Sequence, residues 1–378
     1  MQTRFIDDID DIPADEWNAL VCDDNPFLDH AFLAALEHHG AVGNHSGWHA
    51  HHLIATNNGR LCGAVPLYMK DHSFGEFVFD WAWAHAYARA GIDYYPKLVA
   101  AIPYTPVSGN RLLTGGSTQH EEIARLLVDT AIEFTRGHGL STLHFLFTDN
   151  RDKRVLEEQG LLTRYGCQFH WFNQGYEDFD DFLDALTARH RKNIRRERRR
   201  ITEQDITVEC LHGDHITAEQ WSFFHQCYQA TFDKKTNIAP LSLGFFQEIG
   251  RKLGTRVVLM LAHQGQRPVA SALFLRNQHT LFGRYWGCIA EFDRLHFELC
   301  YYQAIDYCIE HGLRICEAGA QGEHKIGRGF TPVITCSSHW IAEPRFRTVI
   351  QDFLQREQKG IERYITDMRL YLPFRDRN

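Results

Sequence analysis

Proton-transfer and cationic side chains gather in one glycine-rich stretch of the chain, residues 317–332, which reads EAGAQGEHKIGRGFTP. Glu317 and His324 could exchange a proton with a substrate, because carboxyl and imidazole groups are common acid–base catalysts. Lys325 and Arg328 add two cations, and the four glycines would let backbone N–H groups approach an anion. The stretch contains no G-K-[ST] and is therefore not a Walker loop. The stretch therefore predicts an anion-binding turn that carries proton-transfer groups. The alternative is a glycine-rich turn that binds no ligand.

A second group of candidates lies just before this turn, in residues 284–303, RYWGCIAEFDRLHFELCYYQ. It supplies one more carboxyl group, Glu298, together with Arg284, Trp286, His296 and Tyr301. Aromatic residues in such a segment more often form a core or a pocket wall than take part in chemistry. We therefore expect most of these side chains to line a pocket rather than to react.

Basic residues are concentrated in residues 189–201, RHRKNIRRERRRI, where eight of thirteen are Lys or Arg in a chain of net charge −8. Complementing a helix dipole takes only one or two cations, each worth about 0.3–1 kcal/mol. Arginine is also suited to bidentate recognition of phosphate. The cluster favours a phosphate-bearing ligand over the alternative, a solvated helix face.

Two amphipathic helices are predicted in the second half of the chain. The arginines lie in the first, over 179–203, in which apolar residues recur at helical spacing, acids crowd the first turns and bases the last. The second covers 343–370 and has one apolar stripe. We expect this C-terminal helix to dock on the body of the protein.

An internal repeat is the main indication of fold. Residues 57–69, NNGRLCGAVPLYM, and 263–275, HQGQRPVASALFL, both read as a glycine turn followed by an apolar strand. An aromatic strand follows in each half, predicted at 75–84 and 279–289. The pattern indicates two copies of one α+β unit, with chance similarity between two mixed domains as the alternative.

The repeat continues with a Tyr-Tyr segment, which predicts a helix at 91–102 in the first half and at 296–309 in the second. In both halves a helix ending at glycine then leads into a buried strand. The first half alone has an extra segment around 103–122. We predict a first domain over 1–165 and a second over 166–378, which carries the helix at 179–203 and the site.

The two halves differ where the site would be. The first has LHFLFTDNRDKR at 143–154, whereas the second has the glycine-rich turn. Without these glycines a ligand could not approach the backbone closely. We therefore expect the first domain to be degenerate.

Composition excludes several classes of protein. The 378 residues are 44% hydrophobic, and neither a secretory signal nor an apolar run of bilayer length is present. The ten cysteines are scattered, which favours reduced thiols and a cytoplasmic location. Fingerprints of hydrolases, zinc proteases and dinucleotide-binding proteins are missing. The histidines of HSGWHAHHL, residues 45–53, have no Cys or carboxylate at ligand spacing, so no metal site is predicted.

Several longer motifs resemble a known family. They are HRKNIRRERRR, ASALFL, GRYWG, LHFELCYYQAI, GAQGEHKIGRGF and TCSSHW, together with WAHAYARAGIDYYPKLVAAIPYTPVSGNRLL in the first half. The chain resembles FemAB-like predicted N-acyltransferases, which are related to the peptidoglycan aminoacyltransferases. The resemblance covers nearly the whole chain. It implies a tandem pair of GNAT-like domains with a docked C-terminal helix.

The resemblance also implies transfer of an acyl or aminoacyl group to an amine. A lipid-linked cell-wall precursor at the membrane surface is one acceptor that it implies. The donor is left open between acyl-CoA and aminoacyl-tRNA, and no tightly bound cofactor is implied. The helices at 91–102 and 296–309 lack the [QR]-x-x-G-x-[GA] turn that binds acetyl-CoA in GNAT enzymes. No coiled-coil arm, such as Fem proteins have, is evident in 175–260.

Amide formation requires a proton acceptor and a group that polarises the acyl carbonyl. On the resemblance, the candidate catalytic residues are Glu317, His324 and Glu298. The candidate substrate- and phosphate-binding residues are Arg189, Arg191, Lys192, Arg195, Arg196, Arg284, Trp286, His296, Tyr301, Gln321, Lys325 and Arg328. The alternative from another class is a non-catalytic GNAT-fold protein that binds a phosphorylated ligand or RNA.

Overall fold

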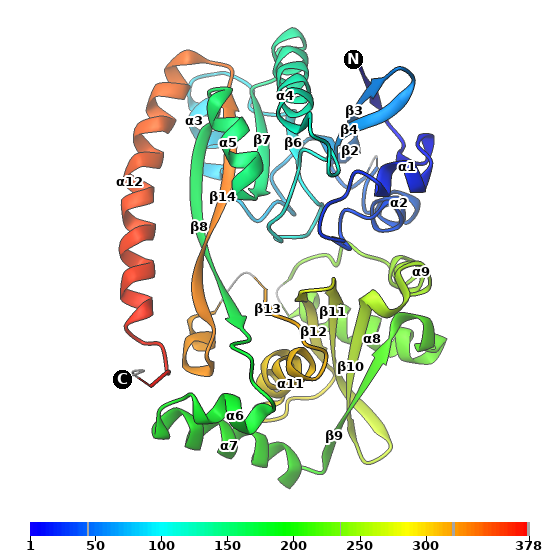
Figure 1. Cartoon of the computed structure of the whole chain (residues 1–378), viewed down its shortest axis with the longest axis vertical. Helices are drawn as coiled ribbons and strands as arrows, with labels where there is room; N and C mark the ends of the chain where they lie inside the picture. The colour runs from blue at the N-terminus through cyan, green and yellow to red at the C-terminus, as the bar shows by residue number, and fades with distance from the viewer. Residues whose placement is uncertain (44, 235, 320–321, 376–378) are drawn as a thin grey trace. The chain divides into compact units, whose positions relative to one another are not determined.

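The computed structural model describes residues 1–43, 45–234, 236–319 and 322–375 (Figure 1). The chain divides into two compact units. Unit 1 comprises residues 1–166 and 334–363, and unit 2 comprises residues 167–333 and 364 onward. The sequence predicts residues 334–363 in the second domain, but they pack with the first unit. No helix in the described part of the chain has the length and apolar character needed to cross a bilayer.

Three elements contain residues of both units, namely β8 (Leu162–Phe172), β14 (Thr331–Ile341) and α12 (Pro344–Arg369). α12 forms as predicted from the apolar stripe. It is continuous through Gly360. Its Ile350 and Leu354 pack in unit 1, and its Tyr364 and Met368 pack against the core of unit 2.

Unit 1 has a mixed sheet in the order β2-β5-β6-β7-β14-β8 and a separate sheet in the order β1-β3-β4. Its other strands are β1 (Gln2–Ile6), β2 (Trp48–Ala50), β3 (His52–Asn57), β4 (Arg60–Val65), β5 (Leu67–Lys70), β6 (Lys97–Ala100) and β7 (Thr142–Thr148). Its other helices are η1 (Ile9–Asp11), α1 (Ala14–Asn18), α2 (His30–His38), α3 (Trp81–Arg89), α4 (His120–Gly137) and α5 (Asn150–Glu158).

Unit 2 has a sheet in the order β8-β13-β12-β11-β10-β9. Its strands, apart from β8, are β9 (Ile206–His212), β10 (Val257–Gln264), β11 (Arg267–Arg276), β12 (Thr280–Cys288) and β13 (Ile315–Glu317). Its helices are α6 (Phe179–Asp184), α7 (Ala188–Glu203), η2 (Gly213–His215), α8 (Ala218–Asp233), α9 (Leu243–Leu253), η3 (Gly254–Arg256), α10 (Leu295–Phe297), η4 (Glu298–Tyr302), α11 (Gln303–Glu310) and η5 (Glu323–Arg328).

The repeat predicted from the sequence is present in the topology. In unit 2 the hairpin β10–β11 is followed by the antiparallel neighbour β12, a helix and the parallel strand β13. In unit 1 the hairpin β3–β4 leads into β5, and the antiparallel neighbour β6, the helix α4 and the parallel strand β7 follow. Both halves are therefore α+β units that contain two adjacent parallel strands connected by a helix.

Two predictions for the first half are wrong. The segment at 91–102 is not the helix of the repeat, because it contains strand β6, and α4 takes the place of the helix. The segment at 75–84 is a loop leading into α3 rather than an aromatic strand. All four residues of β6 are buried, and a short buried apolar run fits a helix or a strand equally well.

The helix predicted over 179–203 is interrupted. α6 ends at Asp184 and α7 begins at Ala188. Between them, Leu186 forms an isolated bridge with Phe374, and Thr187 N donates to Pro373 O. Backbone pairing with the C-terminal segment therefore replaces the helical pattern over one turn.

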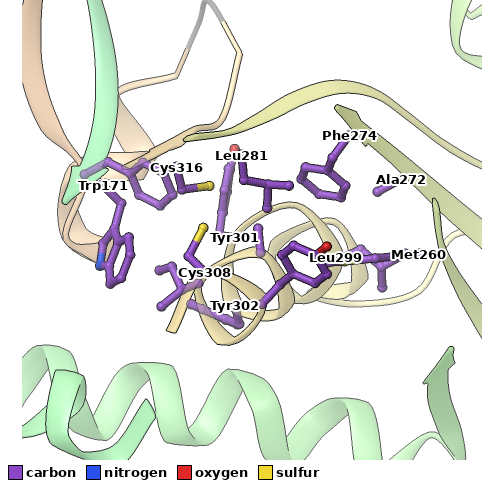
Figure 2. Packing of buried hydrophobic residues seen from close by; sticks show 14 of the residues in the cluster. Trp171, Met260, Ala272, Phe274, Leu281, Leu299, Tyr301, Tyr302, Cys308 and Cys316 are labelled. Atoms are coloured by element: carbon purple, nitrogen blue, oxygen red, sulfur yellow. The ribbon is translucent and has the colours of Figure 1, made fainter. Parts of the chain in front are cut away.

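The core of unit 2 lies between its sheet and the η4–α11 helix (Figure 2). Leu299 and Tyr302 of this helix and Leu281 and Phe274 of the sheet are at most 1% exposed. Trp171 and Phe182 extend the same cluster to β8 and α6. The core thus fixes the short strand β13, which follows the helix, against β12.

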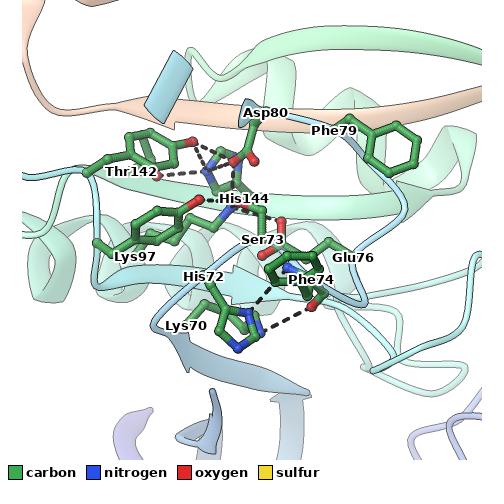
Figure 3. Close-up of polar contacts among 12 residues, drawn as sticks. Lys70, His72, Ser73, Phe74, Glu76, Phe79, Asp80, Lys97, Thr142 and His144 are labelled. Atoms are coloured by element: carbon green, nitrogen blue, oxygen red, sulfur yellow. Dashed lines mark hydrogen bonds and ion pairs between the residues drawn. The ribbon is translucent and has the colours of Figure 1, made fainter. Parts of the chain in front are cut away.

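Unit 1 contains a buried polar cluster around Lys97 (Figure 3). Lys97 Nζ donates to Glu76 at 2.8 Å, to Ser73 at 2.9 Å and to Asp80, and Lys97 is 0% exposed. Tyr94 OH donates to Asp80 at 2.6 Å. Burial opposes both charges, but attraction between the ammonium and the carboxylates raises the pKa of Lys97 and lowers that of Asp80.

We expect Lys97→Met to lower the free energy of unfolding by about 3–5 kcal/mol, because two carboxyl groups would lose their buried cation. Urea unfolding followed by circular dichroism measures this. The control is Lys359→Met on the exposed face of α12, which should change stability by less than about 0.5 kcal/mol. Equal losses in both variants would show that the cluster contributes nothing specific.

Candidate functional site in unit 2

The site is built where β12 and β13 diverge. The two strands pair in parallel over three positions, ending with Phe282 opposite Glu317. β12 then continues to Cys288, hydrogen-bonded to β11 on its other side. A Cβ on Gly283 would lie 3.2 Å from Glu317 O, so the glycine permits the close approach at the point of divergence. Beyond this point one edge of β12 has no partner in β13.

A β-bulge places Arg284 at the divergence. Leu273 of β11 is opposite Tyr285 and Phe274 is opposite Gly283, so Arg284 is the extra residue between the two pairs. A bulge redirects the side chain of the strand that carries it. Arg284 acts electrostatically on Glu317, the last residue of β13.

Glu317 has an unusual environment for a carboxyl group. Its side chain is 13% exposed, and Oε1 lies 3.8 Å from His170 Nδ1 on β8. Burial raises the pKa of Glu317 to about 8, and Arg284 opposes the shift only in part. Burial, reinforced by Lys325, lowers the pKa of His170 to about 3, so this ring is neutral at physiological pH. The pKa of Glu317 therefore lies well above that of an exposed carboxyl group.

Lys325 is the buried cation of the same site. It is 1% exposed, and its Nζ donates to Gly319 O at 2.7 Å. Burial lowers its pKa to about 8, although the thiols of Cys300 and Cys316 act in the opposite direction. An ammonium group has three N–H donors, so a hydrogen bond to one carbonyl leaves it able to bind further acceptors.

Three aromatic side chains connect Lys325 to the surface of the unit. Tyr301 OH is hydrogen-bonded to His324 Nε2 at 2.7 Å, and the His296 ring lies 5.4 Å from Tyr301 and 5.3 Å from Trp286 between centroids. Burial, with a contribution from His324, lowers the pKa of His296 to about 4. The rings of Trp286, His296 and Tyr301 therefore pack side by side, and their role in lining a pocket stays a prediction.

Glu298 lies in a different network. Its Oε1 accepts a hydrogen bond from Gln303 at 2.8 Å and pairs with Arg198 at 3.2 Å, and Arg198 also pairs with Asp306 at 2.7 Å. These contacts join η4 and α11 to α7. Within the described ranges, Glu298 forms no hydrogen bond or ion pair with Glu317 or His324. The structure thus separates Glu298 from the other two catalytic candidates.

Arg328 holds η5 against α7 instead of facing a ligand. Nη2 donates to both oxygens of Glu197 at 2.8 and 2.9 Å, Nε donates to Tyr302 OH at 2.9 Å, and Nη1 donates to His324 O at 2.7 Å. The guanidinium also lies 3.6 Å from the centroid of Phe297. Every nitrogen of Arg328 is therefore engaged, which leaves it a positioning role.

The remaining basic residues of α7 lie on the surface. Arg189, Lys192, Arg195 and Arg196 are exposed, and Arg191 is half-buried. Arg191 pairs with Asp184 at 2.9 Å and Arg195 with Asp180 at 2.8 Å. A surface depression of about 450 Å³ is lined by Ala188, Arg191, Lys192, Arg195, Arg196 and Arg199. α7 therefore presents a cationic surface, which we call the α7 basic surface.

The structure thus sorts the predicted residues into three groups. Glu317 interacts with Arg284, and His324, Tyr301, His296 and Trp286 pack together. Lys325 acts electrostatically on His296 and on His170, which lies beside Glu317. Five basic residues belong to the α7 basic surface. Glu298 and Arg328 lie in structural networks, and Gln321 lies outside the described residues. His170 was missed because it is far away in sequence, on a strand without any motif.

The comparisons with known proteins agree with this architecture. The model of the FemAB-like family, described as peptidoglycan biosynthesis/recognition, matches residues 8–376. The chain therefore belongs to the FemAB-like family. No curated protein matches the sequence at the required significance.

Solved structures show the same fold at low identity. FemX aligns with a TM-score of 0.54 and 12% identity over 92% of this chain and 100% of its own. L-PGS from Bacillus licheniformis aligns with a TM-score of 0.52 and 11% identity over 86% and 95%. The predicted tandem GNAT-like fold is confirmed.

We expect Arg328→Ala to lower the free energy of unfolding by about 2–4 kcal/mol, because it leaves Glu197 buried without its bidentate partner. The matched control is Arg196→Ala on the α7 basic surface, which should cost less than about 0.5 kcal/mol. Thermal unfolding of both variants measures the difference. Equal melting temperatures would contradict the positioning role of Arg328.

Proposed function

We propose that unit 2 transfers an acyl or aminoacyl group from a phosphate-bearing donor to an amine of a cell-wall precursor. The observation that carries the proposal is the buried carboxyl group of Glu317, whose pKa is raised to about 8 at the point where β12 and β13 diverge; the pKa of Lys325, buried on η5, is lowered to about 8. Both groups are poised to exchange protons near neutral pH, as acid–base and electrostatic catalysis require.

In the proposed reaction, the amine nitrogen of the acceptor attacks the acyl carbonyl of the donor. Ionised Glu317 accepts the proton that the amine loses, and Lys325 stabilises the negative charge that develops on the carbonyl oxygen. The new C–N bond replaces the C–S or C–O bond to the donor, and the departing sulfur or oxygen takes the proton from Glu317. Neutral His170 lies beside the carboxyl group and adds no charge that would compete for its proton.

The α7 basic surface would bind the phosphates of the donor. This surface lies on the exposed face of α7, whereas Glu197 on the buried face of the same helix holds Arg328 of η5. Acyl-CoA and aminoacyl-tRNA both carry phosphates, so the surface is compatible with either donor. We place the reaction in the cytoplasm, which is consistent with the ten free cysteines.

Unit 1 would not carry a second active site. In unit 1, β7 extends beyond the end of its partner β6. There it pairs with the extra segment around 103–122, which has no counterpart in the second half. Gly109 forms a parallel bridge with Thr148, and its N–H donates to Phe147 O at 3.0 Å. Leu113 pairs with Ala64 on the hairpin. The extra segment around 103–122 thus pairs with β7 and with the hairpin in unit 1, and the second half has no such segment.

For Glu317→Gln we expect a loss of at least about a hundredfold in kcat/KM, because an amide cannot accept the proton. The wild-type profile of kcat/KM should rise with pH to about 8 as Glu317 ionises and fall above it as Lys325 loses its proton. Donor assays with several acyl-CoA thioesters and aminoacyl-tRNA, at pH values from 6 to about 10, provide the rates. Full activity of Glu317→Gln would exclude this mechanism.

Stability gives an independent check on Glu317. Its folded pKa lies above that of an unfolded carboxyl, so the wild type loses stability as pH rises from the unfolded value to about 8. Glu317→Gln should therefore be more stable than the wild type at high pH and not at low pH. An inactive variant with this stability profile is folded, and its lost activity is chemical.

We expect Arg195→Ala/Arg196→Ala to raise the KM for the donor by about tenfold at low ionic strength, with kcat little changed. The effect should shrink as salt is added, because screening already weakens phosphate contacts. The matched control, Arg356→Ala/Lys359→Ala, removes two cations of α12. A salt-independent loss, or an equal loss in the control, would remove α7 from donor binding.

A further inference from the structure

Two polar side chains of β8 lie in a row with the carboxyl group of Glu317. Gln168 and His170 are two residues apart on the strand, so their side chains point to the same face of the sheet. His170 is directly opposite Glu317 in the antiparallel pairing of β8 with β13. Gln168 is 4% exposed, and the side chain of His170 is 12% exposed. The proposed mechanism uses Glu317 but assigns nothing to Gln168.

The hydrogen bond between Gln168 and His170 determines the tautomer of the imidazole ring. His170 Nε2 lies 3.3 Å from Gln168 Oε1. An amide oxygen can only accept a hydrogen bond, so Nε2 carries the proton. Burial, reinforced by Lys325, lowers the pKa of His170 to about 3, so the ring is neutral and has a single N–H group. Nδ1 is therefore left with a lone pair.

Nδ1 is also the ring nitrogen that lies beside Glu317, 3.8 Å from its Oε1. An ionised carboxylate has only acceptor sites and cannot form a hydrogen bond to a lone pair. A protonated carboxyl group has an O–H group that it can donate to Nδ1 after a small movement. This tautomer of His170 therefore favours the protonated form of Glu317, in the same direction as burial does.

The opposite tautomer would reverse this effect. With the proton on Nδ1, the ring of His170 would donate to the carboxylate of Glu317, stabilise its charge and lower its pKa. Such an N–H···O bond measures about 2.7–3.2 Å between heavy atoms. The observed separation of 3.8 Å is longer, as expected when two acceptors face each other. The distance thus agrees with the tautomer that Gln168 selects.

The other charged groups around Glu317 come from different elements. Arg284 of β12 acts on Glu317 and opposes part of its pKa shift. Lys325 of η5 acts on His170 and helps to keep the ring neutral. Phe282, which is opposite Glu317 on β12, is apolar. A substitution at Gln168 leaves all of these groups in place, so its effect on Glu317 passes through His170.

We propose that Gln168 is a positioning residue of unit 2, which holds the Nδ1 lone pair of His170 toward Glu317 and so keeps the resting carboxyl group protonated. The consequence for catalysis rests on the proposed function, in which Glu317 is the general base. A carboxylate is a stronger base when the pKa of its conjugate acid is higher. Gln168 would therefore set the strength of the base without contacting the substrate.

The test is an NMR titration of the full chain with isotope-labelled glutamate carboxyl groups, in which Glu317→Gln identifies the signal of Glu317. Gln168→Leu removes the acceptor of Nε2 at similar volume, so the imidazole proton can move to Nδ1 and donate to Glu317. We expect the pKa of Glu317 to fall by about one unit. The rising limb of the kcat/KM profile should move to lower pH by the same amount, which loss of packing alone would not cause.

Two further variants isolate the route through His170. In a His170→Phe background, Gln168→Leu should leave the pKa of Glu317 unchanged, because the ring that connects the two residues is missing. The matched control Gln174→Leu replaces an exposed glutamine two residues beyond the end of β8. It should change neither the titration of Glu317 nor the pH profile.

An unchanged pKa of Glu317 in folded Gln168→Leu would overturn the proposal, as would an equal fall in the His170→Phe background. Should Gln168→Leu fail to fold, the nitrogen NMR spectrum of the wild type decides, because a proton on Nδ1 of His170 contradicts the proposal. The titration requires no substrate. A fully active Glu317→Gln with the expected titration would reject the transferase mechanism alone, and an inactive one with an unchanged titration would reject the positioning role alone.

Discussion

The length of β13 is the constraint on which the site of unit 2 depends. The strand pairs with β12 over three residues, and its last residue is Glu317. A longer β13 would satisfy the edge of β12 and bury Glu317 completely, whereas a shorter one would expose it and return its pKa to the usual range. Cys316 of β13 and Leu281 of β12 are buried in the core beneath η4 and α11, which holds the two strands together just before Glu317. Burial at this strand end raises the pKa of the carboxyl group.

The arginine-rich stretch shows how one sequence pattern serves two purposes. Arg198 is held by Glu298 and Asp306, and Glu197 of the same helix receives Arg328. Arg195 and Arg196, less than one turn away, lie on the exposed face. The partners of Arg198 and Glu197 are distant in sequence, so no local pattern could separate the buried arginines from the exposed ones. The stretch predicts a charged helix, but only tertiary pairing tells which charges are available.

The α+β class, the hairpins of the repeat and the C-terminal helix could all be predicted, since glycine turns and apolar periodicity are local signals. Glu317, Lys325 and His324 could be found because they share one glycine-rich turn. The strand at Lys97–Ala100 could not be predicted, because four consecutive buried residues show no hydrophobic periodicity. The break between α6 and α7 at Ala185–Thr187 could not be predicted either, because it depends on backbone pairing with Pro373 and Phe374. His170 reaches Glu317 only through the pairing of β8 with β13. Errors therefore concentrate where distant segments meet.

Two buried lysines show how burial can serve structure or chemistry. Lys97 on β6 has two carboxylates within hydrogen-bonding distance, so attraction outweighs desolvation and its pKa rises. Lys325 donates to a carbonyl, which carries no full charge, so desolvation prevails and its pKa falls to about 8. Glu317 behaves in the same manner, since His170 beside it is neutral. A compensated charge fixes the loop between β5 and α3 in place. An uncompensated group instead has a pKa near neutral. Unit 1 also contains such groups, because burial moves the pKa values of Glu76 and Lys70 to about 7, so the assignment of chemistry to unit 2 rests on the position of Glu317 at the end of β13.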